Sequence, residues 1–242
     1  MKPTNVVVGL GEVGKPLLEI IKERMDVVGV DIQPFEIKNP CEVMHICFPF
    51  QVPDFVGQCA SYIEKYKPQL TVINSTIAPG TTRSVFQRTG RAIAYSPVRG
   101  KHVRMQQDML HYVKFIGGID ANSGREAERH FQSIGMKTKL LSSPEAAEMA
   151  KLSETTYFGV LIAWAQEVER YCDELNLYYD EIASYYEEIS YLPSVKFTPG
   201  VIGGHCVMPN IAILQSRFDS DFLNALEHSN ELKKIREARK NK

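Results

Sequence analysis

Cys206 is the residue of this chain with the clearest chemical potential, because it follows the glycine pair Gly203 and Gly204 at an expected turn from a loop into a helix. A cysteine at such a turn is exposed and lies near the free N–H groups of a helix N-terminus, which favour the thiolate. Cys206 is therefore a candidate nucleophile. The other cysteines are expected to be buried structural residues: Cys41, Cys47, Cys59 and Cys172.

Three glycines near the start of the chain, Gly9, Gly11 and Gly14, follow an apolar run and open a helical pattern. In this motif the first glycine allows a tight turn, the second lets a pyrophosphate approach the backbone, and the third lets helix and strand pack closely. The loop that holds Glu12 and Val13 leads into the helix N-terminus, where free N–H groups and the helix dipole attract an anion. The motif therefore predicts a dinucleotide site.

Asp31 ends the next apolar run, 22 residues after Gly9. A carboxylate at this place accepts a hydrogen bond from a ribose 2′-hydroxyl and repels a 2′-phosphate. The cofactor is therefore expected to be NAD rather than NADP.

Two further polar groups stand beside expected elements. Lys151 lies in the first third of a long helical pattern, with Glu148 and Thr155 on the same face. Its neighbours are apolar, and a partly buried lysine can serve in proton transfer. Residues 72–82 place hydroxyls, including that of Thr76, just past a strand end, where open α/β sheets bind ligands. Their spacing alone also fits an ordinary turn before a capped helix.

Apolar runs alternate with helical patterns through the first part of the chain, which indicates a parallel sheet covered on both faces. The expected strands are residues 5–10, 27–30, 43–48, 70–74, 92–95 and 113–116. The expected helices between them are residues 15–24, 54–66, 82–88 and 124–134. Only ten residues separate Asp31 from Glu42. A helical crossover usually needs more, so this connection is either an extended strap or part of a simpler strand order.

The second part of the chain is helical. A helix is expected to start at Ser143 and Pro144 and to run to about residue 176. Its middle, residues 157–165, is apolar all the way round. We therefore expect it to be buried by its own domain and by a partner subunit in a homodimer. Further helices are expected at about residues 180–190 and at the charged end of the chain.

The expected fold class is α/β, with a Rossmann-type parallel sheet followed by an all-helical domain that contains one long dimerising helix. The first domain is expected to span residues 1–142 and to bind NAD. The second is expected to span residues 143–242.

Composition excludes several other classes of protein. The 28 Lys and Arg residues and 29 Asp and Glu residues give a net charge of −1, which offers no electrostatic footprint for nucleic acid or an anionic membrane. No apolar run reaches the roughly 20 residues of a membrane span, and the start of the chain does not read as a signal peptide. The odd, scattered cysteines suggest a reduced, cytoplasmic protein, and the histidine spacing predicts no metal site.

Several collinear segments resemble the UDP-glucose/GDP-mannose dehydrogenase family over nearly the whole chain. These are V-V-V-G-L-G-E-V-G-K-P near the start, then V-G-V-D, I-N-S-T-I-A-P-G-T-T at 73–82, Y-S-P-V-R at 95–99, F-I-G-G at 115–118, A-E-M-A-K-L at 147–152 and P-G-V-I-G-G-H-C at 199–206. The resemblance implies an enzyme that uses two NAD to oxidise the primary alcohol of a sugar nucleotide to a uronic acid.

The resemblance also implies roles for individual residues. Cys206 matches the nucleophile that captures the aldehyde as a thiohemiacetal, which is then oxidised to a thioester. Lys151 matches a lysine that assists proton transfer and stabilises an oxyanion. Thr76 matches a threonine near the nicotinamide and the catalytic water, and the long helix matches the dimer-forming helix of the family. Residues expected at the cofactor include Glu148, and those expected at the substrate are Lys151, Thr155, Gly203, Gly204 and Asn210.

The chain departs from the family pattern at three positions. Val98 stands where a glutamate is usual, Thr155 where an asparagine is usual, and Asn210 where an aspartate is usual. The chain also ends where the family begins a second α/β domain. We therefore expect a short form of the family whose substrate is smaller or is carried by a partner.

Two alternatives remain open from the sequence. The first is an NAD-binding or scaffold paralogue with impaired catalysis, which the loss of both carboxylates favours. The second is a β-hydroxyacid dehydrogenase, which shares the NAD domain, the long helix and a lysine. That class needs no cysteine, so the G-G-H-C segment argues against it.

Overall fold

A computed structural model describes residues 3–32, 36–37, 39–100, 102–188, 190, 197–204 and 206–240 of the chain. The chain divides into two compact units, Met1–Lys151 (unit 1) and Leu152–Lys242 (unit 2). No helix in the described part of the chain is both long enough and apolar enough to cross a membrane.

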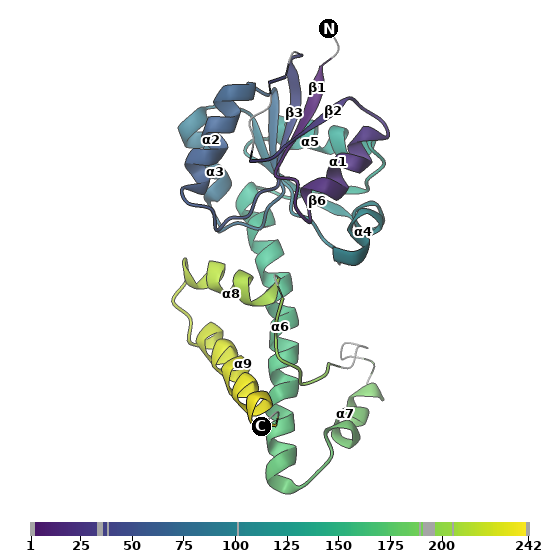
Figure 1. The fold of residues 1–242 in the computed structure, drawn as a ribbon, viewed down its shortest axis with the longest axis vertical. Helices are drawn as coiled ribbons and strands as arrows, with labels where there is room; N and C mark the ends of the chain where they lie inside the picture. Colours follow the sequence, from purple (N-terminus) through teal and green to yellow (C-terminus); the bar gives the residue numbers. More distant parts are fainter. Residues whose placement is uncertain are drawn as a thin grey trace. The chain divides into compact units, whose positions relative to one another are not determined.

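Among the described residues, unit 1 contains a seven-stranded sheet with the strand order β2-β1-β3-β4-β5-β6-β7. Figure 1 shows this sheet between α2 and α3 on one side and α1 on the other. Strands β1 to β5 all run parallel, β6 is antiparallel to β5, and β7 is parallel to β6. The predicted α/β fold is therefore confirmed, with a sheet that is mostly parallel because β6 and β7 run opposite to β1–β5. The strands are β1 (Thr4–Val8), β2 (Val27–Val30), β3 (Cys41–Ile46), β4 (Leu70–Ile73), β5 (Ile93–Tyr95), β6 (Lys114–Gly118) and β7 (Thr138–Leu140).

Helices cover both faces of this sheet, as continuous apolar strands require. The helices of unit 1 are α1 (Gly14–Lys22), α2 (Phe55–Tyr66), α3 (Thr81–Thr89), α4 (Met105–His111) and α5 (Ala121–Ser133), with a short 3-10 turn at His102–Arg104. Helices α2 and α3 pack on one face, together with Val6 and Val8 of β1. Helices α1, α4 and α5 pack on the other face, together with Val7. Alternate residues of each central strand therefore serve two separate cores.

The short connection after β2 carries no helix among its described residues, 31–32, 36–37 and 39–40. It leads from β2, at the edge of the sheet, to β3 on the other side of β1. Within these described residues, the connection fits the extended strap considered from the sequence.

Two elements of unit 1 were not predicted from the sequence, α4 and β7. Helix α4 has only seven residues, and its buried Met105 and Met109 make one i, i+4 pair, which is too little for a recognisable period. Strand β7 has three residues, of which Lys139 and Leu140 are exposed, so it has no apolar run.

Helix α6 (Pro144–Leu175) has 32 residues, close to the predicted length. The backbone N–H of Ala146 donates to Ser143 Oγ at 3.1 Å, so Ser143 caps the helix as expected. The other helices of unit 2 are α7 (Tyr179–Glu187), α8 (Val207–Gln215) and α9 (Asp221–Lys240). In unit 2, α8 packs closely on α6, because a Cβ on Gly159 would lie 2.6 Å from Val207 Cγ1.

Candidate active site

The carboxyl ends of β1 to β5 form one edge of the sheet, and several predicted site residues of unit 1 follow these strands: the glycine loop, Asp31 and Thr76. The residue after each of four strands donates its N–H to the last residue of a neighbouring strand, so the strand ends align along this edge. Open α/β sheets bind ligands at this edge. The four bonds are Gly9 N to Val30 O, Cys47 N to Val8 O, Asn74 N to Ile46 O and Ser96 N to Ile73 O, at 2.8–2.9 Å.

The glycine loop after β1 has the shape that a pyrophosphate site needs. Gly9 has φ +90°, and a Cβ there would lie 2.6 Å from Phe48 N. A Cβ on Gly14 would lie 1.7 Å from Gly9 O, so only glycine lets α1 start so close to β1. Gly11 has no atom within 4 Å of its ideal Cβ position. Gly11 thus faces open space beside the exposed Glu12 and the half-buried Val13, which precede α1, and this cradle fits a dinucleotide.

Asp31 is exposed directly after β2, at the same edge of the sheet. Its charge reaches Tyr62 of α2: burial raises the pKa of that phenol, and Tyr66 and Asp31 raise it further. The carboxylate therefore lies toward the α2 side of the strand ends, where it is accessible to a ligand.

Glu148 is fully buried, and its carboxylate bonds to donors within the chain. Its carboxylate accepts hydrogen bonds from Gly80 N at 2.6 Å, Thr82 N at 2.9 Å and Thr82 Oγ1 at 2.6 Å. These donors belong to the first turn of α3, so Glu148 fastens α6 to the N-terminus of α3. Burial raises the pKa of Glu148, and the bonds from Thr82 and Gly80 oppose that rise. Thr76, also expected at the cofactor, is half-buried in the segment between β4 and α3.

A buried polar cluster, missed in the sequence, lies beneath this edge. Lys114, the first residue of β6, donates from Nζ to Asn74 Oδ1 at 3.2 Å, Ser96 O at 2.7 Å and Pro97 O at 3.1 Å. One side chain thus joins the segment after β4 to the segment after β5. A lysine inside the otherwise apolar stretch V-K-F-I was the available signal, because buried lysines are rare unless they are partnered.

Asn74 links Lys114 to two histidines. His45 of β3 lies 3.2 Å through Nδ1 from Asn74 Nδ2, and its Nε2 lies 2.9 Å from Nε2 of His130 on α5. Burial lowers the pKa of Lys114 to about 7; Cys47 opposes this change and Lys151 adds to it. The charge of Lys151, which is half-buried as expected, therefore acts on this cluster.

In unit 2, Cys206 is exposed directly before α8, where the sequence predicted it. Gly203 and Gly204 are exposed as well, and Gly204 has φ +76°, a conformation that favours glycine. His205 lies outside the described residues. The other four cysteines are buried or half-buried, and burial raises the pKa of Cys41 and of Cys47 to about 12.

Two positions at which the chain departs from the family pattern contact each other. Asn210 of α8 is buried and donates from Nδ2 to Thr155 Oγ1 at 2.9 Å, and Thr155 Oγ1 in turn donates to Leu152 O at 3.1 Å. The third departure, Val98, is only 7% exposed and packs in the core on the α1, α4 and α5 face of the sheet. Within the described residues, no group of three His, Cys, Asp or Glu side chains could hold a metal ion.

Known proteins with similar sequences are nucleotide-sugar dehydrogenases. Residues 145–234 match the central domain of the UDP-glucose/GDP-mannose dehydrogenase family. The UDP-N-acetyl-D-mannosamine dehydrogenase of Methanocaldococcus jannaschii is 26% identical over an alignment 251 residues long. The alignment covers 83% of this chain and 58% of that protein. The chain thus spans 58% of the length of the first curated relatives that it matches.

Solved structures show the same fold. The UDP-D-ManNAc dehydrogenase from Pyrococcus horikoshii has a TM-score of 0.80 at 21% identity, covering 96% of this chain and 68% of that chain. The 3-hydroxyisobutyrate dehydrogenase of Mycobacterium tuberculosis has a TM-score of 0.71 at 16% identity, covering 98% of this chain and 94% of that chain. Residues 145–234 are therefore similar to the central domain of the UDP-glucose/GDP-mannose dehydrogenase family, and the chain shares the fold of these dehydrogenases.

Proposed function

We propose that the chain is part of an NAD-dependent oxidoreductase that oxidises a primary alcohol of a sugar nucleotide. The observation that carries this proposal is the open space at Gly11. Packing requires glycine at Gly9 and Gly14, whereas no atom of the described residues would crowd a Cβ at Gly11. Because Gly11 has no side chain, a pyrophosphate can approach the backbone closely at this position. The names of the relatives support a UDP-linked N-acetylhexosamine, and UDP-N-acetylmannosamine is the first compound to test.

The glycine loop and Asp31 would hold the cofactor. The backbone N–H groups at the start of α1 favour the negative pyrophosphate, and the Asp31 carboxylate accepts a hydrogen bond from the ribose. NAD, when bound, accepts the hydride that each oxidation releases.

Cys206 would serve the second stage of the oxidation. Its thiolate adds to the aldehyde carbon, and the aldehyde oxygen takes up a proton to give a thiohemiacetal. Oxidation of that carbon, with loss of a hydride and of the hydroxyl proton, leaves a thioester. Water then adds to the thioester carbon and expels the thiolate, which releases the carboxylic acid. Lys151 would assist the proton transfers from its half-buried position on α6.

Gly11→Ala tests the proposed cofactor site. The protein should fold and melt as the wild type does, because the added methyl group meets no atom of the chain within 4 Å. Affinity for NAD, measured by titration calorimetry, should fall by at least about tenfold because the methyl group occupies the path of the pyrophosphate. Gly200→Ala is the matched control, since its Cβ also meets nothing within 4 Å, and it should bind NAD normally. Unchanged affinity in Gly11→Ala would contradict the proposed site.

Asp31 should make the protein prefer NAD to NADP. The wild type should bind NAD at least about tenfold more tightly, because a carboxylate repels the 2′-phosphate of NADP. Asp31→Asn should lose most of that preference in the same calorimetric titration. Equal affinity of the wild type for the two cofactors would show that Asp31 does not face the ribose.

The same proposal includes a homodimer that covers an apolar side of α6. Four aromatic residues of this helix are exposed on the single chain, and three of them repeat every seven residues, which puts them along one side of the helix. A partner subunit would remove this surface from water. The four residues, with their exposed fractions, are Tyr157 (56%), Phe158 (49%), Trp164 (53%) and Tyr171 (48%).

Trp164→Glu should convert the dimer into a poorly soluble monomer, because it places an unpaired charge in the interface. Light scattering at micromolar concentration measures the mass. Leu110→Glu, at an exposed apolar residue of α4 in unit 1, is the control and should leave the dimer intact. A monodisperse wild-type monomer would refute the dimer.

A second candidate is an NAD-binding member of the family with impaired catalysis. Two observations favour it: Val98 is buried in the core, and the Asn210 amide is engaged by Thr155. This candidate predicts NAD binding without reduction of NAD when UDP-N-acetylmannosamine is added. The absorbance of reduced nicotinamide distinguishes the two candidates.

A further inference from the structure

The segment that carries Cys206, residues 200–206 (the cysteine segment), has no helix or strand among its described residues. Ile202 at its centre is nevertheless buried. Buried backbone N–H and C=O groups need hydrogen-bond partners, and no neighbouring strand supplies them here. Asn230 of α9 supplies them instead, and Gln166 of α6 bonds to Gly200 at the start of the segment.

Asn230 bonds to both backbone groups of Ile202. Its Oδ1 accepts from Ile202 N at 2.8 Å, and its Nδ2 donates to Ile202 O at 3.0 Å. The side chain is fully buried. One carboxamide thus fixes the backbone of Ile202 in two directions, as an adjacent strand would.

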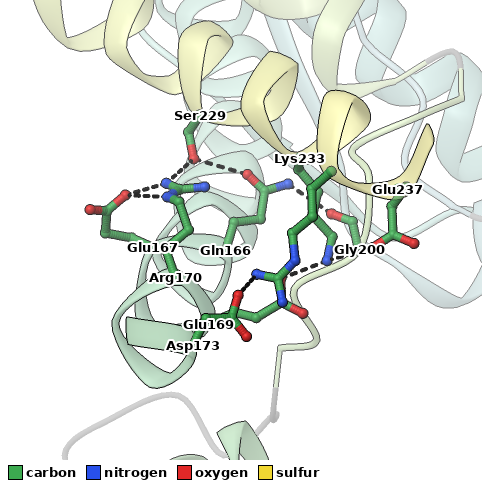
Figure 2. A network of polar contacts seen from close by, with 10 residues as sticks. Gln166, Glu167, Glu169, Arg170, Asp173, Gly200, Ser229, Lys233 and Glu237 are labelled. Atoms are coloured by element: carbon green, nitrogen blue, oxygen red, sulfur yellow. Dashed lines mark hydrogen bonds and ion pairs between the residues drawn. The ribbon is translucent and has the colours of Figure 1, made fainter. Parts of the chain in front are cut away.

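Gln166 holds the start of the same segment, as Figure 2 shows. Its Nε2 donates to Gly200 O at 2.7 Å and lies 3.4 Å from Asn230 Oδ1, while its Oε1 accepts from Ser229 Oγ at 3.0 Å. Arg170 donates to the same Ser229 hydroxyl at 3.0 Å. Because Ser229 donates to Oε1, the Nε2 of Gln166 must point toward Gly200.

Ion pairs hold α9 against α6 beside these amides (Figure 2). Lys233, which is 5% exposed, contacts Glu169 of α6 at 2.6 Å and Glu237 at 2.9 Å. Arg236 pairs with Asp173 of α6 in the next turn. The two helices that carry Gln166 and Asn230 are therefore fixed to each other.

The far end of the cysteine segment is fixed as well. Val207, the residue after Cys206, is buried against Gly159 of α6. Between this anchor and Ile202 lie Gly203 and Gly204, whose backbones are otherwise permissive. The position of Cys206 therefore depends on how firmly the two ends of the segment are held.

We infer that Asn230 and Gln166 are positioning residues that set the place of Cys206 by clamping the backbone of the cysteine segment at Ile202 and Gly200. The inference rests on the proposed function for the role of Cys206 as nucleophile. The clamp itself is a property of unit 2 and is tested separately below.

Hydrogen exchange tests the clamp on the full chain, without substrate. Asn230→Ala should speed amide exchange in residues 198–206 by at least about tenfold, because Ile202 loses both of its partners. Asn224→Ala makes the same change at an exposed residue of the same helix and should leave this exchange unchanged. Unchanged exchange in Asn230→Ala would overturn the clamp.

A steady-state assay tests the link to Cys206. With NAD and UDP-N-acetylmannosamine, Asn230→Ala should lower kcat by at least about tenfold, with the KM for NAD within about twofold of the wild-type value, because the glycine loop is untouched. Because a partly unfolded sample would also lose apparent kcat at constant KM, kcat is expressed per folded protein, with the folded fraction taken from an unfolding curve of the same variant. A kcat equal to that of Asn224→Ala would refute a positioning role.

A second substitution covers the case in which Asn230→Ala does not fold. Gln166→Met keeps a straight side chain of similar length. It also removes the bonds to Ser229 and Asn230, but within the cysteine segment it frees only Gly200 O, so it should give a smaller increase in exchange confined to the start of the segment. If exchange there stays at the wild-type rate, the clamp is wrong. If the wild type does not oxidise the sugar nucleotide, the proposed function fails, and the exchange experiments alone decide whether the clamp exists.

Discussion

Lowering the pH from 7 to 5 should reduce the free energy of unfolding of this protein by about 3 to 4 kcal/mol, because two buried histidines cannot take up protons in the folded state. The two residues are His45 and His130, whose Nε2 atoms lie 2.9 Å apart. When both rings are neutral, one ring donates to the other. Protonation of the Nε2 that accepts this hydrogen bond would set two N–H groups against each other in a buried space.

The surroundings of the pair also disfavour a charge. Burial lowers the pKa of His45 well below its usual value, and His130 and Lys114 lower it further. Burial lowers the pKa of His130 to about 4. The rings contact each other, Phe131 of α5 and the amide of Asn74.

The lowered pKa values of His45 and His130 make the folded protein less stable at lower pH. Unfolded histidines take up protons near pH 6.5, whereas in the folded state the pKa of His130 is about 4 and the pKa of His45 lies well below its usual value. The unfolded state therefore binds more protons between these values, and stability falls as the pH falls through this window. Each histidine that stays neutral contributes about 1.8 kcal/mol of loss between pH 7 and pH 5.

Urea unfolding of the wild type and of His130→Gln at pH 7 and pH 5 measures this effect. The glutamine can still bond to His45 but does not titrate, so about half of the pH dependence should disappear. His228→Gln, at an exposed histidine of α9, should keep the full dependence. An equal pH dependence in His130→Gln and the wild type would show that the pair is not the cause.

Features that depend on neighbours in the sequence could be predicted without a structure. The glycine loop could be placed because Gly14 packs against Gly9, only five residues earlier: a Cβ on Gly14 would lie 1.7 Å from Gly9 O. The start of α6 could be placed because Ser143 caps the helix by accepting a hydrogen bond from the N–H of Ala146, three residues later. Strands buried on both faces were visible as apolar runs, although β1 ends at Val8 and not at Leu10.

Features that depend on distant contacts could not be predicted. His45, Asn74, Lys114 and His130 come from four separate elements and form one cluster only in the folded sheet. In the same way, Asn230 lies in a charged helix that reads as a solvated surface, yet it is fully buried against Ile202. The sequence also could not show that Glu148 serves α3, because its donors lie more than sixty residues earlier in the chain.

The second large effect concerns how far the proposed oxidation goes. Alcohol to aldehyde needs a hydride acceptor and a base, whereas aldehyde to acid also needs an activated water to hydrolyse the thioester on Cys206. In the family that the sequence resembles, carboxylates at positions 98 and 210 serve this stage. Here Val98 is buried in the core, and the Asn210 amide donates to Thr155. A valine cannot accept a proton, and an amide is a poor base.

A stalled second stage is therefore expected. Positioned acid–base groups contribute about 10²- to 10⁴-fold to a rate, so their absence slows hydrolysis of the thioester without affecting the first oxidation. An acyl group should accumulate on Cys206, and intact-protein mass spectrometry after incubation with NAD and UDP-N-acetylmannosamine should detect it. Fast turnover with two NADH per substrate and no adduct would refute the stall, as would full activity in Cys206→Ala.

A carboxylate at position 210 should speed hydrolysis of the thioester on Cys206. In Asn210→Asp the side chain keeps its shape, and the Thr155 hydroxyl can turn from Leu152 O to donate to the new carboxylate. The yield of NADH should then rise toward two per substrate, and hydrolysis of the adduct should accelerate by at least about tenfold. Asn224→Asp makes the same chemical change on the exposed side of α9 and should leave both quantities at their wild-type values. If Asn210→Asp folds and binds NAD but the adduct persists unchanged, the missing carboxylate at position 210 is not what limits the second oxidation.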